Sequence, residues 1–256
     1  DAMASYDEKD STCTKRKDIN FEKSLSKDFG SLNIGVIKNI EKLGINEDVI
    51  NAYETSKTVL TGLGHKLIEV DFSELSSGIC SYYVIAPAEC SSNLSRFDGV
   101  KYGYRSDGDK DIVNLYMNTR SDGFGDEVKK RILIGTHVLS AGFYDAYYLQ
   151  AQKVRRMIKV KFENFFKDVD LIFMPTTLDQ AFEKNRKSDD PNRMYKEDLL
   201  TIPANLAGLP AISFPNGFKN NLPIGGQLIG KYFGEDLLLN TTHKIQEVTD
   251  WHKMTP

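Results

Sequence analysis

The sequence has little of what marks a secreted, membrane-spanning or metal-binding protein. It holds 3 cysteines, Cys13, Cys80 and Cys90, an odd number with no CxxC spacing. That pattern predicts no disulfide framework and no metal site, and it fits a reducing compartment. No apolar run approaches the roughly 18 residues that a membrane span needs, and the polar residues 1–30 show no signal-peptide pattern. We therefore expect no membrane contact.

The common motifs of nucleotide-binding and hydrolytic sites are also missing. The pair Gly225-Gly226 belongs to neither a phosphate loop nor a dinucleotide fingerprint, and no GxSxG nucleophile elbow occurs. The four histidines are scattered without an HExxH pattern and are interpreted as surface or packing residues: His65, His137, His243 and His252. The residues alone therefore identify no nucleophile paired with a base.

The composition is that of an ordinary globular protein. Apolar residues make up 40% of the 256 positions and charged residues 27%, and 33 Lys and Arg against 36 Asp and Glu give a net charge of -3. This balance argues against a free-standing nucleic-acid binder, which would be basic. The length suits one large domain or two small ones. The chain begins at Asp1 rather than methionine, as a piece of a longer protein would.

The first third of the chain predicts a connector followed by a strand–helix–strand unit. Residues 1–30 are polar and irregular, and we interpret them as a loop. A β-branched strand is expected over residues 32–37, and an alternating strand over residues 65–72. Between them, Asn46 caps a helix that ends near Gly62. Short links of this kind favour parallel pairing of the two strands.

The middle third is predicted to be helical. A helix is expected over residues 77–94, although it contains Pro87, and residues 98–125 are interpreted as a loop with a short helix over residues 112–117. A long helix over residues 126–166 is expected to break near Gly142. Cys80 and Cys90 are predicted to be small buried residues on different helix faces. The basic run over residues 153–161 is interpreted as a solvated helix face rather than a patch that contacts nucleic acid.

The last third returns to strands, over residues 170–174, 211–214 and 224–229, and closes with a helix over residues 235–248. Together these elements predict an α/β protein with a mixed or parallel sheet.

Arg131 is the polar residue with the most informative spacing. Gly135, Val138 and Gly142 follow it at i+4, i+7 and i+11, which makes a small or apolar stripe that we expect to face inward. A buried arginine is costly unless it meets an anion. Two interpretations stay open: an ion pair with a carboxylate of the core or a loop, and a fork that binds a ligand carboxylate.

Several segments carry a resemblance to a known family. Residues 82–103 are the longest, and residues 120–131 continue into residues 140–148. Shorter matches are residues 7–12, 198–210, 223–225 and 249–253. The chain resembles the A subunits of glutamyl-tRNA(Gln) amidotransferases, in the amidase signature family. The resemblance implies the C-terminal half of an α/β/α fold with a central mixed sheet flanked by helices. Residues 1–30 would be a connector, and residues 31–256 would belong to a single amidase domain.

The resemblance also implies which residues act. The family's Ser-Ser-Lys triad lies upstream of the segment that residues 1–12 resemble, so we expect no catalytic residue in this chain and no activity from it alone. The residues that hold the substrate glutamine in the family fall on Tyr82, Arg131 and Asp198. Arg131 would pair with the α-carboxylate and Asp198 with the α-ammonium, while Tyr82 would supply a hydroxyl and an aromatic wall.

The activity implied is glutamine hydrolysis, whose ammonia converts Glu-tRNA(Gln) to Gln-tRNA(Gln) in a complex with B and C subunits. No cofactor is expected in this chain, because ATP and magnesium would be used by the partner subunit, which would also contact most of the tRNA. The compartment would be a bacterial cytoplasm or an organelle. Two alternatives stay open. The first is a non-catalytic interaction module that folds alone or complements a separate N-terminal half, and for it we expect an open sheet edge and exposed apolar surface. The second is another amidase of the family, and the presence of both Arg131 and Asp198 argues against it.

Three places in the chain depart from what the resemblance leads us to expect. Gly226 replaces a larger apolar residue, and Asn216 replaces a small residue after Pro215. A third departure is Thr177-Leu178. We expect these changes to affect local packing rather than ligand contacts.

Overall fold

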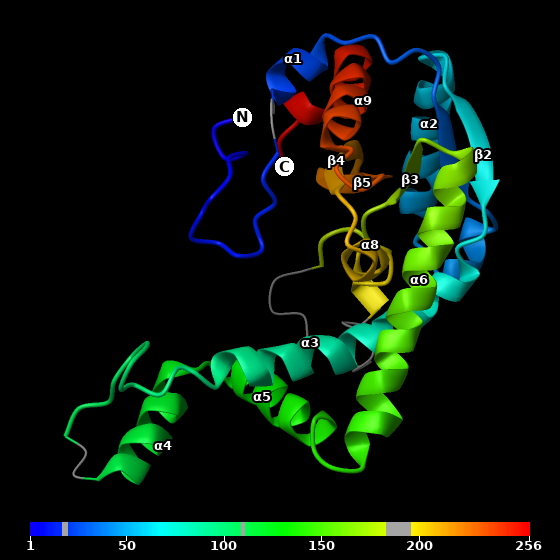
Figure 1. The fold of residues 1–256 in the computed structure, drawn as a ribbon. Helices are drawn as coiled ribbons and strands as arrows, with labels where there is room; N and C mark the ends of the chain where they lie inside the picture. Colours follow the sequence, from blue (N-terminus) through cyan, green and yellow to red (C-terminus); the bar gives the residue numbers. More distant parts are fainter. Residues whose placement is uncertain (17–19, 109–110, 183–195) are drawn as a thin grey trace. The chain divides into compact units, whose positions relative to one another are not determined.

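The chain forms two compact units (Figure 1). A computed structural model describes residues 1–16, 20–108, 111–182 and 196–256. The sheet unit comprises residues 1–76 and 159–256, and the helical unit comprises residues 77–158. None of the helices in these described ranges is long and apolar enough to cross a membrane.

The sheet unit is built on five strands in the order β2-β1-β3-β5-β4. Their bounds are Asn33–Ile37 (β1), Lys66–Val70 (β2), Leu171–Pro175 (β3), Ala211–Lys219 (β4) and Leu222–Gly230 (β5). β1 pairs in parallel with β2 and β3, whereas β5 pairs antiparallel with β3 and β4. The sheet is therefore mixed, as predicted, and the expected parallel pairing of the first two strands is confirmed.

Helix α2 (Glu47–Gly62) connects β1 to β2 and packs on the sheet. Its predicted cap is confirmed, because the Asn46 side chain accepts a hydrogen bond from the backbone N–H of Asp48. The fully buried Tyr53 stacks on Phe173 of β3 with ring centroids 5.2 Å apart. Its hydroxyl accepts the backbone N–H of Ile37 at 2.8 Å, so the buried phenol has a partner.

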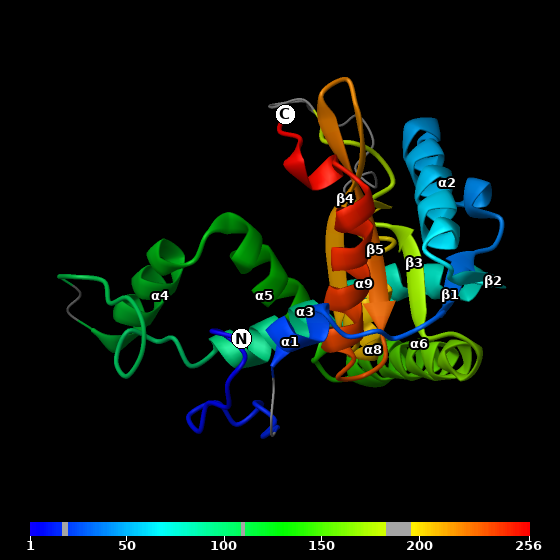
Figure 2. The ribbon, with the colours of Figure 1, turned by 90° about the horizontal axis from the view of Figure 1, so that it is seen from above.

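Helices cover both faces of the sheet (Figure 2). α9 (Glu235–Val248) lies on the same face as α2, and α8 (Ile202–Ala207) lies on the other with the C-terminal part of α6 (Leu149–Asp168). The buried side chain of Gln227 on β5 donates from Nε2 to the carbonyls of Pro175 and Leu200. These bonds fix the segment that leads into α8 against the sheet. β3 is buried along its whole length and forms the centre of the core.

The connector contains one short helix that the sequence analysis did not predict. α1 spans Phe21–Leu25, and the Asn20 side chain caps it by accepting the backbone N–H of Lys23. The buried Asn240 of α9 donates from its amide to the carbonyls of Ser24, Leu25 and Lys27 at 2.8–3.0 Å. These bonds satisfy carbonyls at the C-terminal end of α1 and fasten the connector to α9. Further 3₁₀ turns cover Ile40–Leu43, Ser73–Ser77 and Trp251–Lys253.

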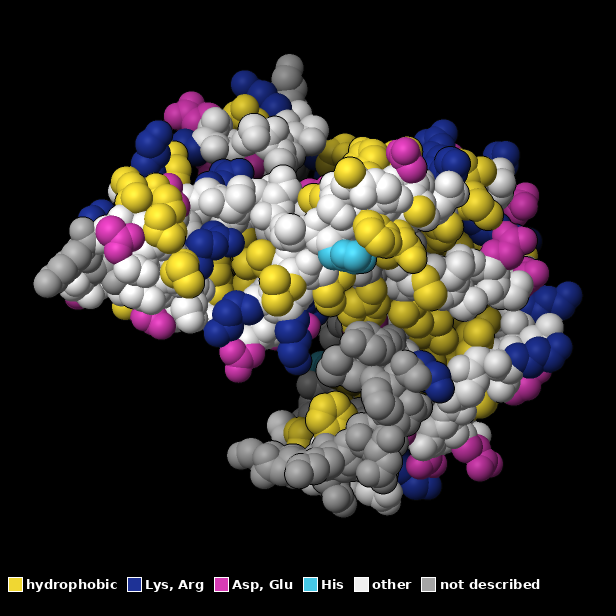
Figure 3. Space-filling model, turned by 90° about the horizontal axis from the view of Figure 1, so that it is seen from below, with side chains coloured by type: hydrophobic (Ala, Val, Ile, Leu, Met, Phe, Trp, Pro, Cys, Tyr) yellow, Lys and Arg dark blue, Asp and Glu magenta, His cyan; other side chains and the backbone are white. Residues whose placement is uncertain are grey.

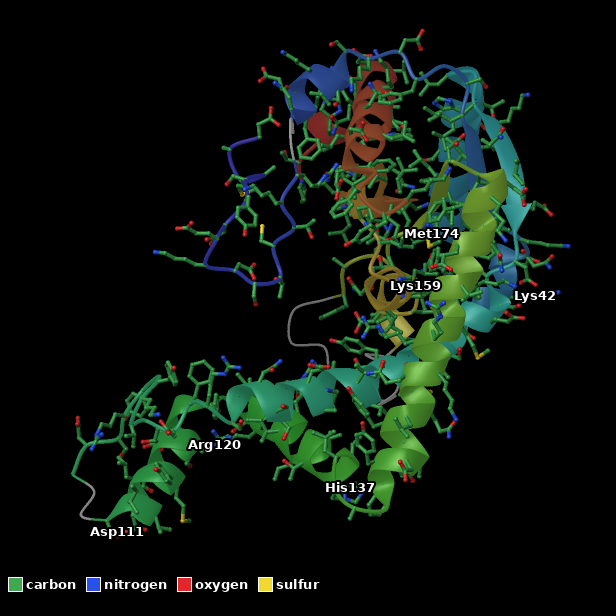
Figure 4. All side chains as sticks on the ribbon, viewed as in Figure 1. Lys42, Asp111, Arg120, His137, Lys159 and Met174 are labelled. Atoms are coloured by element: carbon green, nitrogen blue, oxygen red, sulfur yellow. The ribbon has the colours of Figure 1, made fainter. Side chains whose placement is uncertain are left out.

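The helical unit comprises α3 (Gly78–Leu94), α4 (Ile112–Gly123), α5 (Asp126–Val138), a π-helical turn over Tyr144–Tyr148 and the first part of α6. The expected break near Gly142 is confirmed, since this glycine has φ +86° in the link that follows α5. α4 runs six residues beyond its predicted end at Met117. At its N-terminus Asp111 accepts the N–H groups of Val113 and Asn114 (Figure 4).

Arg120 joins the end of α4 to the end of α3. Its Nη1 donates to the carbonyls of Leu94 and Phe97 at 3.1 and 3.0 Å, and its guanidinium lies over the ring of Phe124. Figure 4 shows Arg120 and Asp111 at opposite ends of α4. The turn at the C-terminal end of α3 is thus held to α4 by a charged side chain.

The prediction that Cys80 and Cys90 are buried is wrong. Cys80 is exposed and Cys90 is partly exposed on α3. The buried residues of this helix include Ser81, Ile85 and Ala88, at helical spacing, so the face that carries Cys80 turns outward.

Apolar side chains also remain on the surface. Leu133 is 70% exposed and Met117 is 64% exposed, and both belong to the helical unit. Figure 3 shows one face of the molecule on which apolar side chains gather. Within the described residues, β2 and β4 form the two outer edges of the sheet. The expected open edge and exposed apolar surface are therefore both present.

The two departures Asn216 and Gly226 compensate each other sterically. Asn216 is 1% exposed on β4, and a Cβ built on Gly226 would lie 3.1 Å from its amide group and 3.1 Å from the Phe173 ring. The absence of a side chain at position 226 therefore makes room for the asparagine. The amide has no hydrogen-bond partner among the described residues, which is costly in an apolar setting.

His65 gives the sheet unit a specific dependence on pH. Its Nδ1 accepts the backbone N–H of Leu32 at 3.2 Å, where β1 begins. Burial lowers the pKa of His65 below its usual value. Protonation removes the acceptor, so the unfolded state binds the proton more readily. The contribution of His65 to the free energy of unfolding is therefore fully present above about pH 6.5, the usual pKa of an unfolded histidine. It is lost as the pH falls below that value.

We expect the urea concentration at the unfolding midpoint to be lower at pH 5.5 than at pH 7.5, and we expect this difference to be larger in the natural protein than in His65→Asn. The asparagine side-chain oxygen can accept the same bond without titrating. His252→Asn, at an exposed position, is the matched control and should keep the natural dependence. Equal pH dependence in all three proteins would contradict this role of His65.

Candidate functional site

Tyr82 and Arg131 come together in the helical unit although they are far apart in sequence. Tyr82 lies on α3 and Arg131 on α5, and Arg131 Nη1 donates to the Tyr82 hydroxyl at 3.5 Å. Figure 1 shows these two helices side by side, and their residues contact each other extensively. Two of the three predicted glutamine-binding residues are therefore neighbours.

A glycine on α5 allows this close approach. A Cβ built on Gly135 would lie 1.9 Å from the carbonyl oxygen of Pro87 and 2.7 Å from the Cβ of Ser91, both on α3. Only glycine leaves room for the α3 backbone there. One residue further along, the hydroxyls of Ser91 and Thr136 lie 2.9 Å apart in a hydrogen bond. This contact is about one helical turn beyond Arg131, so it sets the distance between Arg131 and α3.

Arg131 also forms an ion pair on its own helix. Its Nε donates to Glu127 Oε1 at 3.1 Å, four residues earlier, and the two side chains are 34% and 59% exposed. The hydrogen bond with Tyr82, and then the one with Glu127, raise the pKa of Arg131 above its usual value. The guanidinium is therefore a fixed cation beside a phenol hydroxyl, a combination that suits a carboxylate ligand.

The predicted inward stripe is correct for its central residues only. Gly135 and Val138 are buried, whereas Arg131 is partly exposed and Gly142 lies exposed in the link after α5. The helix ends at Val138, which removes Gly142 from the stripe. Of the two interpretations left open for Arg131, an ion pair is present, but its carboxylate, Glu127, is on the same helix rather than in the core or a loop.

Asp198 belongs to the sheet unit. It is partly exposed, and its backbone carbonyl accepts the N–H groups of Thr201 and Ile202 as the chain enters α8. The N-cap position of α8 is Thr201, so Asp198 lies in the turn just before the helix. Its assignment to the α-ammonium of glutamine stays a prediction.

Sequence reasoning missed Glu127. A carboxylate four residues before an arginine on a predicted helix is a recognised side-chain pair, so the spacing could have identified it. Within the described parts of the chain, no cluster of three or more His, Cys, Asp or Glu side chains could hold a metal ion. The arrangement can bind an anion, but it does not by itself supply a nucleophile.

The Amidase family model matches residues 1–239. The chain therefore belongs to the amidase family. It is 49% identical, over 255 residues, to the A subunit of the Coxiella burnetii glutamyl-tRNA(Gln) amidotransferase, and this match covers 100% of the chain and 53% of the relative. The corresponding protein of Hahella chejuensis is 50% identical over 254 residues, covering 99% and 52%. The chain spans about half the length of the curated relatives it matches.

Solved structures agree on the fold. The crystal structure of the A subunit from Thermotoga maritima matches 98% of this chain with a TM-score of 0.74 and 35% identity, and the match covers 50% of that protein. A 6-aminohexanoate cyclic dimer hydrolase matches 98% of the chain and covers 52% of that protein, with a TM-score of 0.72 at 19% identity, which shows the shared fold alone. The predicted fold, half of an amidase-signature α/β architecture, is confirmed.

Proposed function

We propose that this chain is the glutamine-recognising part of an amidase subunit that supplies ammonia to a glutamyl-tRNA(Gln) amidotransferase. The observation that carries the proposal is the contact between Arg131 and Tyr82, in a chain 49% identical to the A subunit of such an enzyme. A guanidinium next to a hydroxyl suits the α-carboxylate of an amino acid better than it suits a simple amide.

The ligand in this proposal is free glutamine. Arg131 pairs with its α-carboxylate, Tyr82 lines the site with its ring and hydroxyl, and Asp198 accepts hydrogen bonds from its α-ammonium. The assignment of Asp198 rests on the resemblance and on its carboxylate chemistry. Opposite charges that meet a zwitterion favour glutamine over an amide that lacks both charges.

Catalysis belongs to the longer protein in this proposal. A serine attacks the amide carbon, a lysine acting through a second serine moves the protons, and backbone amides hold the oxyanion. The acyl-enzyme forms as ammonia leaves, and this ammonia passes to a partner subunit, which uses ATP and magnesium to activate Glu-tRNA(Gln). A third, small subunit completes the complex, in a bacterial cytoplasm or an organelle. We assign no cofactor to this chain.

We expect the purified 256-residue chain to release no ammonia from glutamine, because it supplies recognition without a nucleophile. The complete protein, assembled with its partners, should release ammonia and should form Gln-tRNA(Gln) when ATP is added. A coupled ammonia assay on both proteins checks this. Ammonia release by the 256-residue chain would contradict the division of roles, and an inactive complete complex would contradict the proposed function.

The open sheet edges favour a second candidate, a module that complements a separately made N-terminal half. β2 and β4 present unpaired edges within the described residues, and such edges readily pair with another chain. Mixing the 256-residue chain with the other half distinguishes the candidates. Recovery of ammonia release upon mixing would support complementation.

A further inference from the structure

We infer that Glu127 is a positioning residue, which holds the Arg131 guanidinium so that its outer N–H groups face the α-carboxylate of glutamine. This inference rests on the proposed function and deepens it. Glu127 itself touches neither the substrate nor the reacting atoms; it acts through Arg131.

The donors of Arg131 show how this works. A guanidinium carries five N–H groups, one on Nε and two on each terminal nitrogen. Glu127 Oε1 accepts from Nε at 3.1 Å, and the Tyr82 hydroxyl accepts from Nη1 at 3.5 Å. These two contacts use different nitrogens. Among the described residues no other partner of Arg131 is present, so the Nη2 groups and one N–H of Nη1 are available for a carboxylate.

The two contacts also limit the rotation of the guanidinium. Arginine has several rotatable bonds, and a ligand must fix them when it binds. Glu127 on α5 and Tyr82 on α3 hold the group from two helices before any ligand arrives. A preorganised fork loses less conformational entropy on binding, which lowers the cost of binding glutamine. The pair with Glu127 therefore matters more for the ligand than for the fold.

The exposure of the pair supports this distinction. Glu127 is 59% exposed, and exposed i,i+4 ion pairs add little to folding stability. Its removal should leave the unfolding transition nearly unchanged. An effect on glutamine binding without an effect on stability is therefore the signature of a positioning role.

The test compares Glu127→Ala and Glu127→Gln in the complete protein, assembled with its partners. We expect Glu127→Ala to raise KM for glutamine about three- to tenfold and to leave kcat within about twofold of the natural value. The guanidinium of Arg131 loses its fixed orientation in this variant, which weakens binding but does not change the chemical step. Glu127→Gln keeps an oxygen that can accept from Nε, so its KM should lie closer to the natural value. Asp126→Ala is the matched control, since Asp126 is the neighbouring first-turn carboxylate and pairs with Lys129 instead.

A second substrate separates positioning from general damage. L-Glutaminamide has a carboxamide in place of the α-carboxylate, so its kcat/KM should change little in Glu127→Ala. An unchanged KM for glutamine, or equal losses for glutamine and glutaminamide, would overturn the inference while the natural enzyme stays active. A lower KM would overturn it too, because it would show that Glu127 competes with the substrate. A natural complex that does not hydrolyse glutamine would instead refute the proposed function, and the inference with it.

Discussion

Arg131→Met in the complete protein is expected to raise KM for glutamine about 30-fold or more, which corresponds to about 2 kcal/mol, the lower end of the cost of removing one partner of a hydrogen-bonded charge pair. Methionine keeps much of the length and packing of arginine, so α5 should fold normally. In the proposed assignment the α-carboxylate of glutamine then loses its cationic partner, and the Tyr82 hydroxyl is left as a single neutral contact. Steady-state kinetics, together with calorimetric titration of glutamine, measures the loss.

The matched control is Lys130→Met, which removes a positive charge from the neighbouring position of the same helix. This variant should keep the natural KM, because the structure gives Lys130 no hydrogen bond to Tyr82 among the described residues. A natural KM in Arg131→Met would contradict the assignment of the carboxylate site. Equal losses in both variants would show that only the net charge of α5 matters.

The elements with strong local signals could be predicted from the sequence. The Asn46 cap, the break near Gly142 and the closing helix at residues 235–248 are all found where the sequence analysis placed them. The predicted strands at residues 211–214 and 224–229 are too short, because β4 and β5 continue toward a two-residue turn at Asn220-Asn221. Both asparagines have positive φ, of 51° and 63°, which is the usual chemistry of a tight hairpin.

The site could be predicted only in part. The spacing around Arg131 identified an inward stripe, but the meeting of Arg131 with Tyr82 joins residues 49 positions apart. No local sequence pattern extends over that separation, and the contact depends on how α3 and α5 pack. The same holds for Asn216, whose burial depends on the missing side chain of Gly226 on the adjacent strand. For Cys80 the error has a different cause. Burial was predicted from its residue type, whereas the helix face that carries it is exposed.

The packing of α3 on α5 makes Gly135 the position with the largest expected effect on stability. A methyl group at this position would lie 1.9 Å from the Pro87 carbonyl oxygen and 2.5 Å from its carbonyl carbon. These are backbone atoms of a helix, so no side-chain rotation can relieve the overlap. Gly135→Ala should therefore push α5 away from α3. We expect it to destabilise the helical unit by about 3 kcal/mol or more, at the upper end of overpacking effects.

Gly125→Ala is the matched control for that substitution. Gly125 precedes the same helix with φ -67°, and a Cβ there meets nothing within 4 Å. The control should lose no more than about 1 kcal/mol, because alanine is a poorer N-cap than glycine, whereas Gly135→Ala should melt at a clearly lower temperature and lose hydrogen-exchange protection in α3 and α5. Wild-type protection in Gly135→Ala would show that the helices do not approach as closely as described.

Gly135→Ala also tests how the site is assembled. The glycine lies one turn beyond Arg131, so separating the helices should move Arg131 away from Tyr82 and raise KM for glutamine as well. Arg131→Met, by contrast, should raise KM without a comparable loss of protection. A Gly135→Ala protein that is less stable but binds glutamine normally would contradict the idea that helix packing sets the position of Arg131. The two variants together therefore distinguish the charge of the guanidinium from the packing that places it.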